Sequence, residues 1–262
     1  MTWAVYAVKY AERNERTRAD SFLFDDNHDQ PHAMDYFLWV LEKNGRRILV
    51  DTGYDAEEGR ARGRPIAQDP REALKPLGIE AESVDDVIVT HLHYDHAGGL
   101  HLFPKAKLHL QTAEMAFATG PCMCHGTLRA PFTANHVCEA VKRLYGGKVI
   151  FYDGDGEVAE GVTVHRIGGH SRGLQAVRVL TEAGWLCLAS DAAHYYENAF
   201  ARKPFPIVVD VESMLSGFDR LHQLASRPGL IVPGHDPQVR VLFPEVAPGI
   251  HRLDGGPMGD PE

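Results

Sequence analysis

Short apolar runs separated by glycine, proline and aspartate recur along the chain. The runs are rich in β-branched and aromatic residues, a composition that is typical of strands bounded by turns. In the first half they predict strands over 4–9, 36–42, 47–50, 87–90 and 107–110. In the second half they predict strands over 149–152, 162–167, 176–180, 185–189 and 230–232.

Helical signals are fewer and fall in three segments. Asp69 and Pro70 form an N-cap and first-turn pair, and their helix should end near Gly78. The segment 132–145 is followed by two glycines, as a helix C-terminus often is. Asp210 can cap a third helix, which should end before the next proline-glycine pair. The apolar face of this helix would consist of Met214, Leu215, Phe218, Leu221 and Leu224.

The strands fall into two groups, each followed by helix. The segments 47–51 and 185–191 echo one another, because both are apolar strands that end in an aspartate. This pattern predicts an α/β protein with two sheets packed face to face and helices outside. Since no linker or shift in composition marks a boundary, we expect a single domain over 1–253 and a loose tail over 254–262.

Composition narrows the classes of partner. The formal net charge of −9 disfavours a general affinity for the phosphate backbone, so no nucleic-acid partner is expected. No apolar run is long enough to span a bilayer, and the first residues do not have the pattern of a signal peptide. Four cysteines form no disulfide framework in a chain of this length. These features predict a cytoplasmic protein that does not bind membranes.

The segment 87–99 passes from an apolar strand into a turn that contains His91, His93, Asp95 and His96. In extended backbone His91 and His93 point to the same side and can share one cation. Asp95 and His96 follow where the chain turns, so they can face a second cation. Imidazole and carboxylate without thiolate suit Zn²⁺, and also Mn²⁺, Fe or Co²⁺. A polar loop of hydrogen-bonded histidines is the alternative, but three histidines and an aspartate at this spacing favour metal.

At these residues the sequence resembles the metallo-β-lactamase superfamily, whose signature is His-x-His-x-Asp-His after a strand. The segment 48–53 is similar to the strand that precedes this signature in the family. Two glycines precede His170 where the family has Pro-Gly-His-Ser/Thr. Asp191 and His235 match the later ligand elements, and the resemblance covers residues from about 34 to 243.

The resemblance implies an αββα sandwich of two mixed sheets with a dinuclear metal site, most simply two Zn²⁺ ions. The implied ligands are His91, His93 and His170 for one cation, Asp95, His96 and His235 for the other, and Asp191 as a bridge. Taken singly, His170, Asp191 and His235 would each more often be structural residues than ligands. Asp51 could either orient a ligand histidine or begin a turn.

Within the superfamily the chain most resembles the N-acyl-homoserine lactonases, which are quorum-quenching enzymes. The resemblance implies a hydrolase that opens a small lactone ring by attack of a metal-bridging hydroxide on the carbonyl. Asp95 would carry a proton to the leaving oxygen. These lactonases have a substrate-binding tyrosine three residues after the bridging aspartate, where this chain has His194. Tyr195 is therefore our first candidate for this polar contact and His194 our second.

Several features leave alternatives open. An acyl-chain pocket could be lined by Phe22, Phe24, Phe117, Met123 and Phe205, although such residues more often belong to a core. Cys122-Met123-Cys124 lacks the spacing of a metal motif and suggests a loop or subunit contact. A homodimer is expected only by analogy.

The main alternative function is a thioesterase of the glyoxalase II type, or another small-ester hydrolase of the same superfamily. Such a thioesterase would use the same seven ligands but adds a C-terminal helical region. Only 27 residues follow His235, so we expect a small lactone or ester as the substrate.

Overall fold

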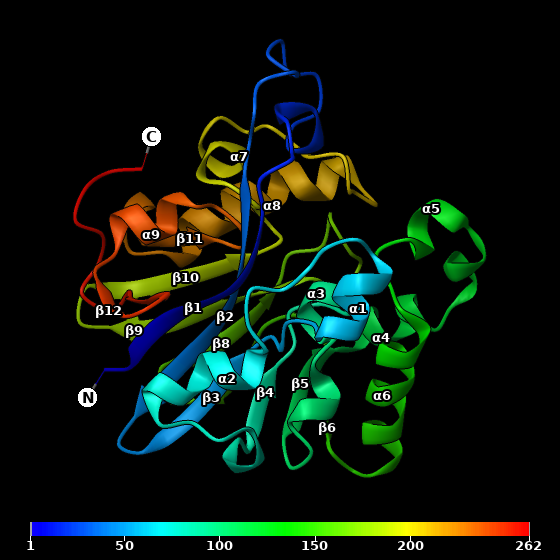
Figure 1. Ribbon diagram of the computed structural model, residues 1–262, viewed down its shortest axis with the longest axis vertical. Coiled ribbons are helices and arrows are strands. Elements are labelled where there is room, and N and C mark those ends of the chain that lie inside the picture. The colour runs from blue at the N-terminus through cyan, green and yellow to red at the C-terminus, as the bar shows by residue number, and fades with distance from the viewer. Residues whose placement is uncertain (1, 262) are drawn as a thin grey trace.

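The computed structural model describes residues 2–261, in which two mixed β-sheets stack face to face (Figure 1). The larger sheet has the strand order β12 (Glu245–Ala247), β13 (Ile250–Arg252), β1 (Ala4–Arg13), β2 (Met34–Lys43), β3 (Arg46–Val50), β4 (Asp86–Ile88), β5 (Lys107–Gln111) and β6 (Val149–Tyr152). The smaller sheet has the order β11 (Ile231–Pro233), β10 (Gly184–Ser190), β9 (Gln175–Thr181), β8 (Val162–Arg166) and β7 (Gly156–Ala159).

Helices cover the outer faces of both sheets, which confirms the predicted αββα sandwich (Figure 1). The helices are α1 (Ala56–Ala61), α2 (Pro70–Leu74), α3 (Tyr94–Ala97), α4 (Thr112–Ala118), α5 (Gly126–Arg129), α6 (Ala134–Tyr145), α7 (Tyr196–Phe200), α8 (Val211–Leu224) and α9 (Gln238–Leu242). Short 3₁₀ helices span Arg18–Asp20, Lys75–Leu77, Ala81–Ser83, Leu100–Leu102, Pro121–Cys124 and Pro228–Leu230.

Strand β2 shows why the layers form. Residues 34–41 of this strand are all buried, and successive side chains point to opposite faces of the sheet. Leu38 and Val40 pack under the helices, whereas Trp39 and Leu41 pack between the two sheets. Because both faces are covered, residues 36–41 form an uninterrupted apolar run rather than an alternation of apolar and polar residues.

Each predicted strand segment contains a strand of the structure. The sequence did not reveal β7, β12 and β13, which are only three or four residues long. These segments lack the apolar run that marks the equally short β4 and β11, and β13 is held in place by pairing with the distant β1.

The three predicted helices are present, with altered starts or internal geometry. Asp210 caps α8 as expected, accepting hydrogen bonds from the backbone of Glu212 and Ser213. The helix that begins at Pro70 changes to 3₁₀ geometry at Lys75 and ends at Gly78. The remaining α-helices have seven residues or fewer, too short for a clear 3.6-residue pattern.

The first residue of the expected loose tail, Asp254, is hydrogen-bonded to strand β1. The Asp254 carboxylate is buried and accepts a hydrogen bond from the backbone of Val5, at 3.2 Å. Met258 also donates a backbone hydrogen bond to Leu242, at 2.8 Å, although its side chain is exposed. The expectation of one domain over 1–253 stays a prediction. Within residues 2–261 no helix is long and apolar enough to cross a membrane.

Helix α6 holds the loop that follows the histidine motif. Arg143 is buried on this helix and its guanidinium donates to the carbonyls of Leu100, Phe103 and Ala106, at 3.0–3.1 Å. Buried carbonyl groups that lose their donors are destabilising. Arg143 therefore fixes the position of this loop against the helix.

Substitution Arg143→Met should lower the free energy of unfolding by about 2–4 kcal/mol, because it keeps the aliphatic stem and removes the donors. The neighbouring Lys142→Met, at a largely exposed side chain, should change it by no more than about 0.5 kcal/mol. Urea denaturation of the two variants measures the difference. Equal stability of both would show that the guanidinium does not hold the loop.

Candidate metal centre

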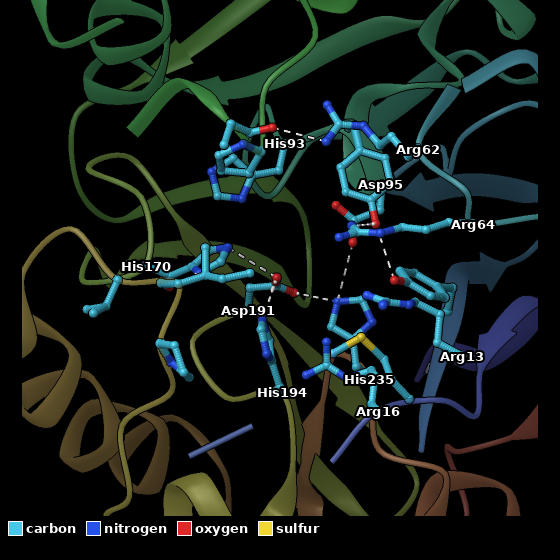
Figure 2. A pocket seen from close by; sticks show the side chains of 18 of the residues that line it. Arg13, Arg16, Arg62, Arg64, His93, Asp95, His170, Asp191, His194 and His235 are labelled. Atoms are coloured by element: carbon cyan, nitrogen blue, oxygen red, sulfur yellow. Dashed lines mark hydrogen bonds and ion pairs between the residues drawn. The ribbon is translucent and has the colours of Figure 1, made fainter. Parts of the chain in front are cut away.

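The seven side chains expected to bind metal lie together at one end of the sandwich. They come from the segment after β4 and from the loops that follow β8, β10 and β11. Figure 2 shows five of them, His93, Asp95, His170, Asp191 and His235, around one cavity. Strand ends thus bring together residues that are far apart in the sequence.

The ligand atoms form overlapping groups in which all atoms lie within 4.8 Å of one another. Two groups coincide with the expected ligand sets, namely His91, His93 and His170, and Asp95, His96 and His235. Two further groups share Asp191: His91, His96 and Asp191, and His170, Asp191 and His194. His194 was not among the metal ligands that we expected from the sequence.

Asp191 lies between the two expected ligand sets. Its Oδ1 is 3.2 Å from Nε2 of His96 and 3.0 Å from Nε2 of His235. Its Oδ2 is 3.2 Å from Nε2 of His170 and 3.9 Å from Nε2 of His91. Each carboxylate oxygen therefore faces a different set of imidazoles, as a bridging ligand would.

Backbone carbonyl groups orient two of the imidazoles. Nδ1 of His170 lies 2.6 Å from the carbonyl oxygen of Ile207, and Nδ1 of His235 lies 2.8 Å from that of Asp35. Since a carbonyl can only accept, each Nδ1 carries the proton and each Nε2 presents a lone pair. Both lone pairs point toward the centre, as metal-binding histidines require.

Unsatisfied atoms show that the residues fit a bound cation. Nε2 of His96 and Oδ1 of Asp191 are buried and form no hydrogen bond with any residue from 2 to 261. The lone pair of His170 Nε2 also lies only 3.2 Å from Nε2 of His91. Buried polar atoms rarely remain unpaired, so imidazole nitrogens and carboxylate oxygens at these positions suit a transition metal.

Electrostatics favour the ligand forms of His91, His93 and Asp191, whereas, in spite of burial, the pKa of His235 is raised by Asp191. Burial lowers the pKa of His91 and His93 well below the usual range, which keeps both imidazoles neutral. Burial opposes the charge of Asp191, but the surrounding histidines, with His96 first, bring its pKa well below the usual range. Burial likewise opposes the charge of His96, whose pKa is nevertheless raised by Asp191, Asp51 and Asp95. Competition with a cation would remove that proton.

The ends of β3 and β10 meet behind the ligands. Asp51 Oδ2 is 2.7 Å from Nδ1 of His96, which supports the interpretation of Asp51 as a residue that orients a ligand. Thr90 Oγ1 lies 2.8 Å from both Asp51 Oδ2 and Ser190 Oγ and so joins the two sheets. Asp51 and Ser190 both have positive φ angles, of 61° and 47°, and backbone strain of this kind is common at functional sites.

Glu114 was not recognised from the sequence, although it links two ligand loops. Its buried carboxylate on α4 accepts from the backbone of Leu92 at 2.9 Å and from that of Gly173 at 2.9 Å. It also accepts from the hydroxyl of Ser171. A Cβ on Gly173 would lie 2.1 Å from the backbone nitrogen of Glu114, so only glycine permits this approach. The sequence held one signal for this role, because Glu114 is a charged residue beside Met115 on an apolar face of the helix.

A cavity of about 310 Å³ opens beside the histidines and is lined by His194 as well as by expected ligands. Tyr195, our first candidate for substrate contact, is outside the described lining and donates its hydroxyl to the carbonyl of Ala33, at 3.1 Å. Its ring packs against Phe22 and His32, because the chain turns into α7 at this residue. The structure thus favours the second candidate, His194.

The alternative of an aromatic acyl-chain pocket is not supported at this cavity. Among the described residues that line the cavity, none of the five predicted side chains is present. Phe22, Phe117 and Phe205 are buried in core clusters, Met123 packs at the edge of one, and Phe24 is fully exposed. Residues from other elements, including Leu128 of α5, form the apolar wall instead; this could not be seen from the sequence order.

The purified protein should contain about two equivalents of transition metal, because two ligand sets share Asp191. Asp191→Asn and His93→Ala should each lower metal content and hydrolytic activity. The controls Asp153→Asn and His101→Ala, at exposed side chains outside the cavity, should leave both unchanged. Elemental analysis by mass spectrometry measures the content. Full activity of a metal-free preparation would contradict the assignment.

Glu114→Gln should weaken metal retention about 10- to 100-fold, because an amide NH₂ would face the donors that now hold the ligand loops. Competition with a chelator measures this affinity. Glu72→Gln, on the exposed side of α2, is the matched control and should behave as the unchanged protein. Equal metal retention by both variants would show that Glu114 does not position the ligands.

Similar known proteins indicate the family of the chain. The model of the metallo-beta-lactamase superfamily matches residues 36–235. An N-acyl homoserine lactonase of Bacillus cereus is 31% identical over 76% of this chain and 80% of its own length. A probable metallo-hydrolase of Mycobacterium tuberculosis is 25% identical over 79% of this chain and 76% of its own length.

A solved structure of an N-acyl homoserine lactone hydrolase, with the product N-hexanoyl-L-homoserine bound at its catalytic metal centre, is 25% identical with a TM-score of 0.71. The superposition covers 90% of this chain and 94% of that structure. The chain therefore belongs to the metallo-beta-lactamase superfamily and is a metal-dependent hydrolase.

Proposed function

We propose that this hydrolase opens the ring of a small lactone, with N-acyl-homoserine lactones as the class to test first. The observation that carries the proposal is the bridging position of Asp191 between two histidine sets at the wall of a cavity. The similarity to N-acyl homoserine lactonases, at 31% identity for the Bacillus cereus enzyme, supports a lactone over other carbonyl substrates.

Seven residues would hold two cations, with zinc as the first choice of metal: His91, His93, Asp95, His96, His170, Asp191 and His235. When bound, such cations supply Lewis acidity, which polarises a carbonyl group and makes water a better nucleophile near neutral pH. The protein contributes the arrangement, because backbone carbonyls and Asp51 hold the imidazoles in one orientation.

Asp95 is the residue we propose for proton transfer. Its side chain lines the cavity, and its Oδ2 lies 3.8 Å from Nε2 of His96 and 3.9 Å from Nε2 of His235. Water attack forms a C–O bond to the carbonyl carbon, and the ring C–O bond then breaks. The proton released by the water passes to Asp95, which returns it to the leaving oxygen, so the product is a hydroxy acid.

His194 replaces the tyrosine of the lactonases, and we propose it as the polar wall of the substrate site. Burial lowers the pKa of His194 to about 3, so its imidazole is neutral near pH 7. Its Nε2 donates to Oδ2 of Asp191, at 2.9 Å, and its ring stacks on Phe205 with centroids 3.7 Å apart. These contacts fix the orientation of the ring at the cavity wall.

Metal-loaded protein should hydrolyse lactones faster than thioesters, phosphodiesters or β-lactams, since its site resembles those of lactonases. Acid release in a pH-stat, and a specific assay for each other bond, compare kcat/KM across such a panel. Protein treated with a chelator is the control. Strong thioester turnover without lactone turnover would favour the glyoxalase II type of function instead.

A further inference from the structure

Four arginines face the cavity: Arg13, Arg16, Arg62 and Arg64. Figure 2 shows all four around the cavity, with Arg64 beside Asp95 and Arg16 beside His235. Arg13 is the last residue of β1 and Arg16 follows that strand, whereas Arg62 and Arg64 lie in the segment after α1. A local excess of cations in a chain of net charge −9 calls for an explanation.

Arg62 is explained by the fold. Its guanidinium forms an ion pair with Glu58 at 2.5 Å and donates to the carbonyls of Ala130 and Phe132. It also donates to the hydroxyl of Thr133, at 2.8 Å. These contacts satisfy most of its donors, so Arg62 ties α1 to the chain that precedes α6.

Contacts within the fold do not satisfy the donors and charge of Arg16 in the same way. Only 6% of its surface is exposed, and no carboxylate among residues 2–261 forms an ion pair with it. Its Nη2 donates to the carbonyl of Asp20 and the hydroxyl of Ser21, but its Nε is buried without a hydrogen-bond partner in the described chain. Burial of an arginine charge without an anion is unfavourable, and buried donors are rarely left unpaired.

Arg13 and Arg64 also lack an ion pair with any carboxylate of residues 2–261. Arg64 donates to the hydroxyl of Tyr94 and lies 5.1 Å from the centre of its ring. A phenol is a neutral acceptor, so this contact positions the guanidinium without neutralising it. Three arginines therefore face the same cavity without an ion pair to a carboxylate of residues 2–261.

Nearby carboxylates are already engaged. Asp25 and Glu197 each form an ion pair with Arg18, at 2.7 Å. The charge of this structural arginine is therefore paired within the fold. Asp95 and Asp191 are the carboxylates among the described residues of the cavity wall, and both face the histidines. An anion that pairs with these guanidinium groups would therefore come from outside the chain.

We propose that the substrate carries an oxyanion group, a carboxylate or a phosphate, remote from its reacting carbonyl and bound by Arg13, Arg16 and Arg64. The proposal rests on the proposed function, and it changes the expected substrate from a neutral acyl-homoserine lactone to an anionic lactone or ester. Arginine suits this role because its planar donor fork binds carboxylates and phosphates through two hydrogen bonds.

The rest of the wall agrees with a compact, partly apolar substrate. Met34, Leu128, Pro131, Ile207 and Val209 line the cavity together with the arginines. A volume of about 310 Å³ lies at the small end for ligand sites. A short apolar spacer between the reacting ring and the anionic group therefore fits better than a long acyl chain.

Matched substrates test the proposal. Three γ-butyrolactones would carry a short side chain that ends in a methyl, a carboxylate or a phosphate group. The metal-loaded protein should have a kcat/KM at least about 10-fold higher for one of the anionic lactones than for the methyl lactone. The better of the two identifies the anion.

Arg13→Met and Arg64→Met should each lower kcat/KM for the preferred anionic lactone about 10- to 100-fold, with less than about 3-fold change for the methyl lactone. Arg64→Lys should recover part of the loss, because it keeps the charge without the planar fork. Arg60→Met is the matched control, since Arg60 is exposed on α1 and outside the cavity wall. Thermal unfolding and metal content confirm that each variant is folded and loaded.

Equal turnover of all three lactones, or an equal effect of the variants on all three, would overturn the anion proposal and leave the lactonase proposal standing. A binding measurement, which needs no turnover, tests the arginine site independently of the lactonase proposal. Isothermal titration should show glutarate or inorganic phosphate binding to the metal-loaded protein more tightly than to metal-loaded Arg64→Met. If no lactone is hydrolysed but this difference is present, the lactonase proposal fails and the arginine site stands; equal binding removes the arginine site.

Discussion

The buried carboxylate of Asp191 is the interaction on which the arrangement of the site depends. Its two oxygens lie between 2.9 and 3.2 Å from nitrogens of His96, His235, His170 and His194. An isolated carboxylate would be strongly disfavoured at such burial, but surrounding imidazoles, and the cations that these imidazoles suit, offset that cost. The loops after four strands must therefore converge on this one position, at the end of an otherwise apolar sandwich.

Further buried carboxylates keep those loops in register. Asp51 connects the first sheet to His96 and, through Thr90, to Ser190 at the end of the second sheet. Glu114 performs the same task for the segments of His91 and His170, accepting three hydrogen bonds from them and their neighbours. Since each carboxylate is fully buried and hydrogen-bonded, the ligand positions are built into the fold rather than left to flexible loops.

Chemistry and recognition come from different parts of the chain. The histidines and aspartates follow strand ends deep in the sandwich, whereas the arginines lie on β1, the loop after it and the segment after α1. Members of one superfamily can therefore keep one hydrolytic centre while the covering segments select the substrate. In this chain the cover is cationic, and the fold offers no anion to Arg16. These covering segments therefore make the cavity wall partly cationic, whereas a purely apolar wall would suit an acyl chain.

The sequence by itself determined the strand pattern, the layered fold and the candidate ligands, because apolar strands and closely spaced histidines leave local signals. The echo of 47–51 and 185–191 had a physical basis, since both strands end at the centre with strained residues, Asp51 and Ser190. Resemblance alone, rather than spacing, added His170, Asp191 and His235. Short strands such as β13 escaped recognition because distant pairing holds them in place.

Only the tertiary structure decided which side chains face the cavity. Tyr195 and His194 are neighbours in the sequence. The hydroxyl of Tyr195 is hydrogen-bonded to the carbonyl of Ala33, whereas the ring of His194 lines the cavity. Only folding places Glu114 and Arg64 beside segments that are distant in the sequence. Burial and the direction of a side chain depend on contacts between remote parts of the chain, and a linear pattern does not record them.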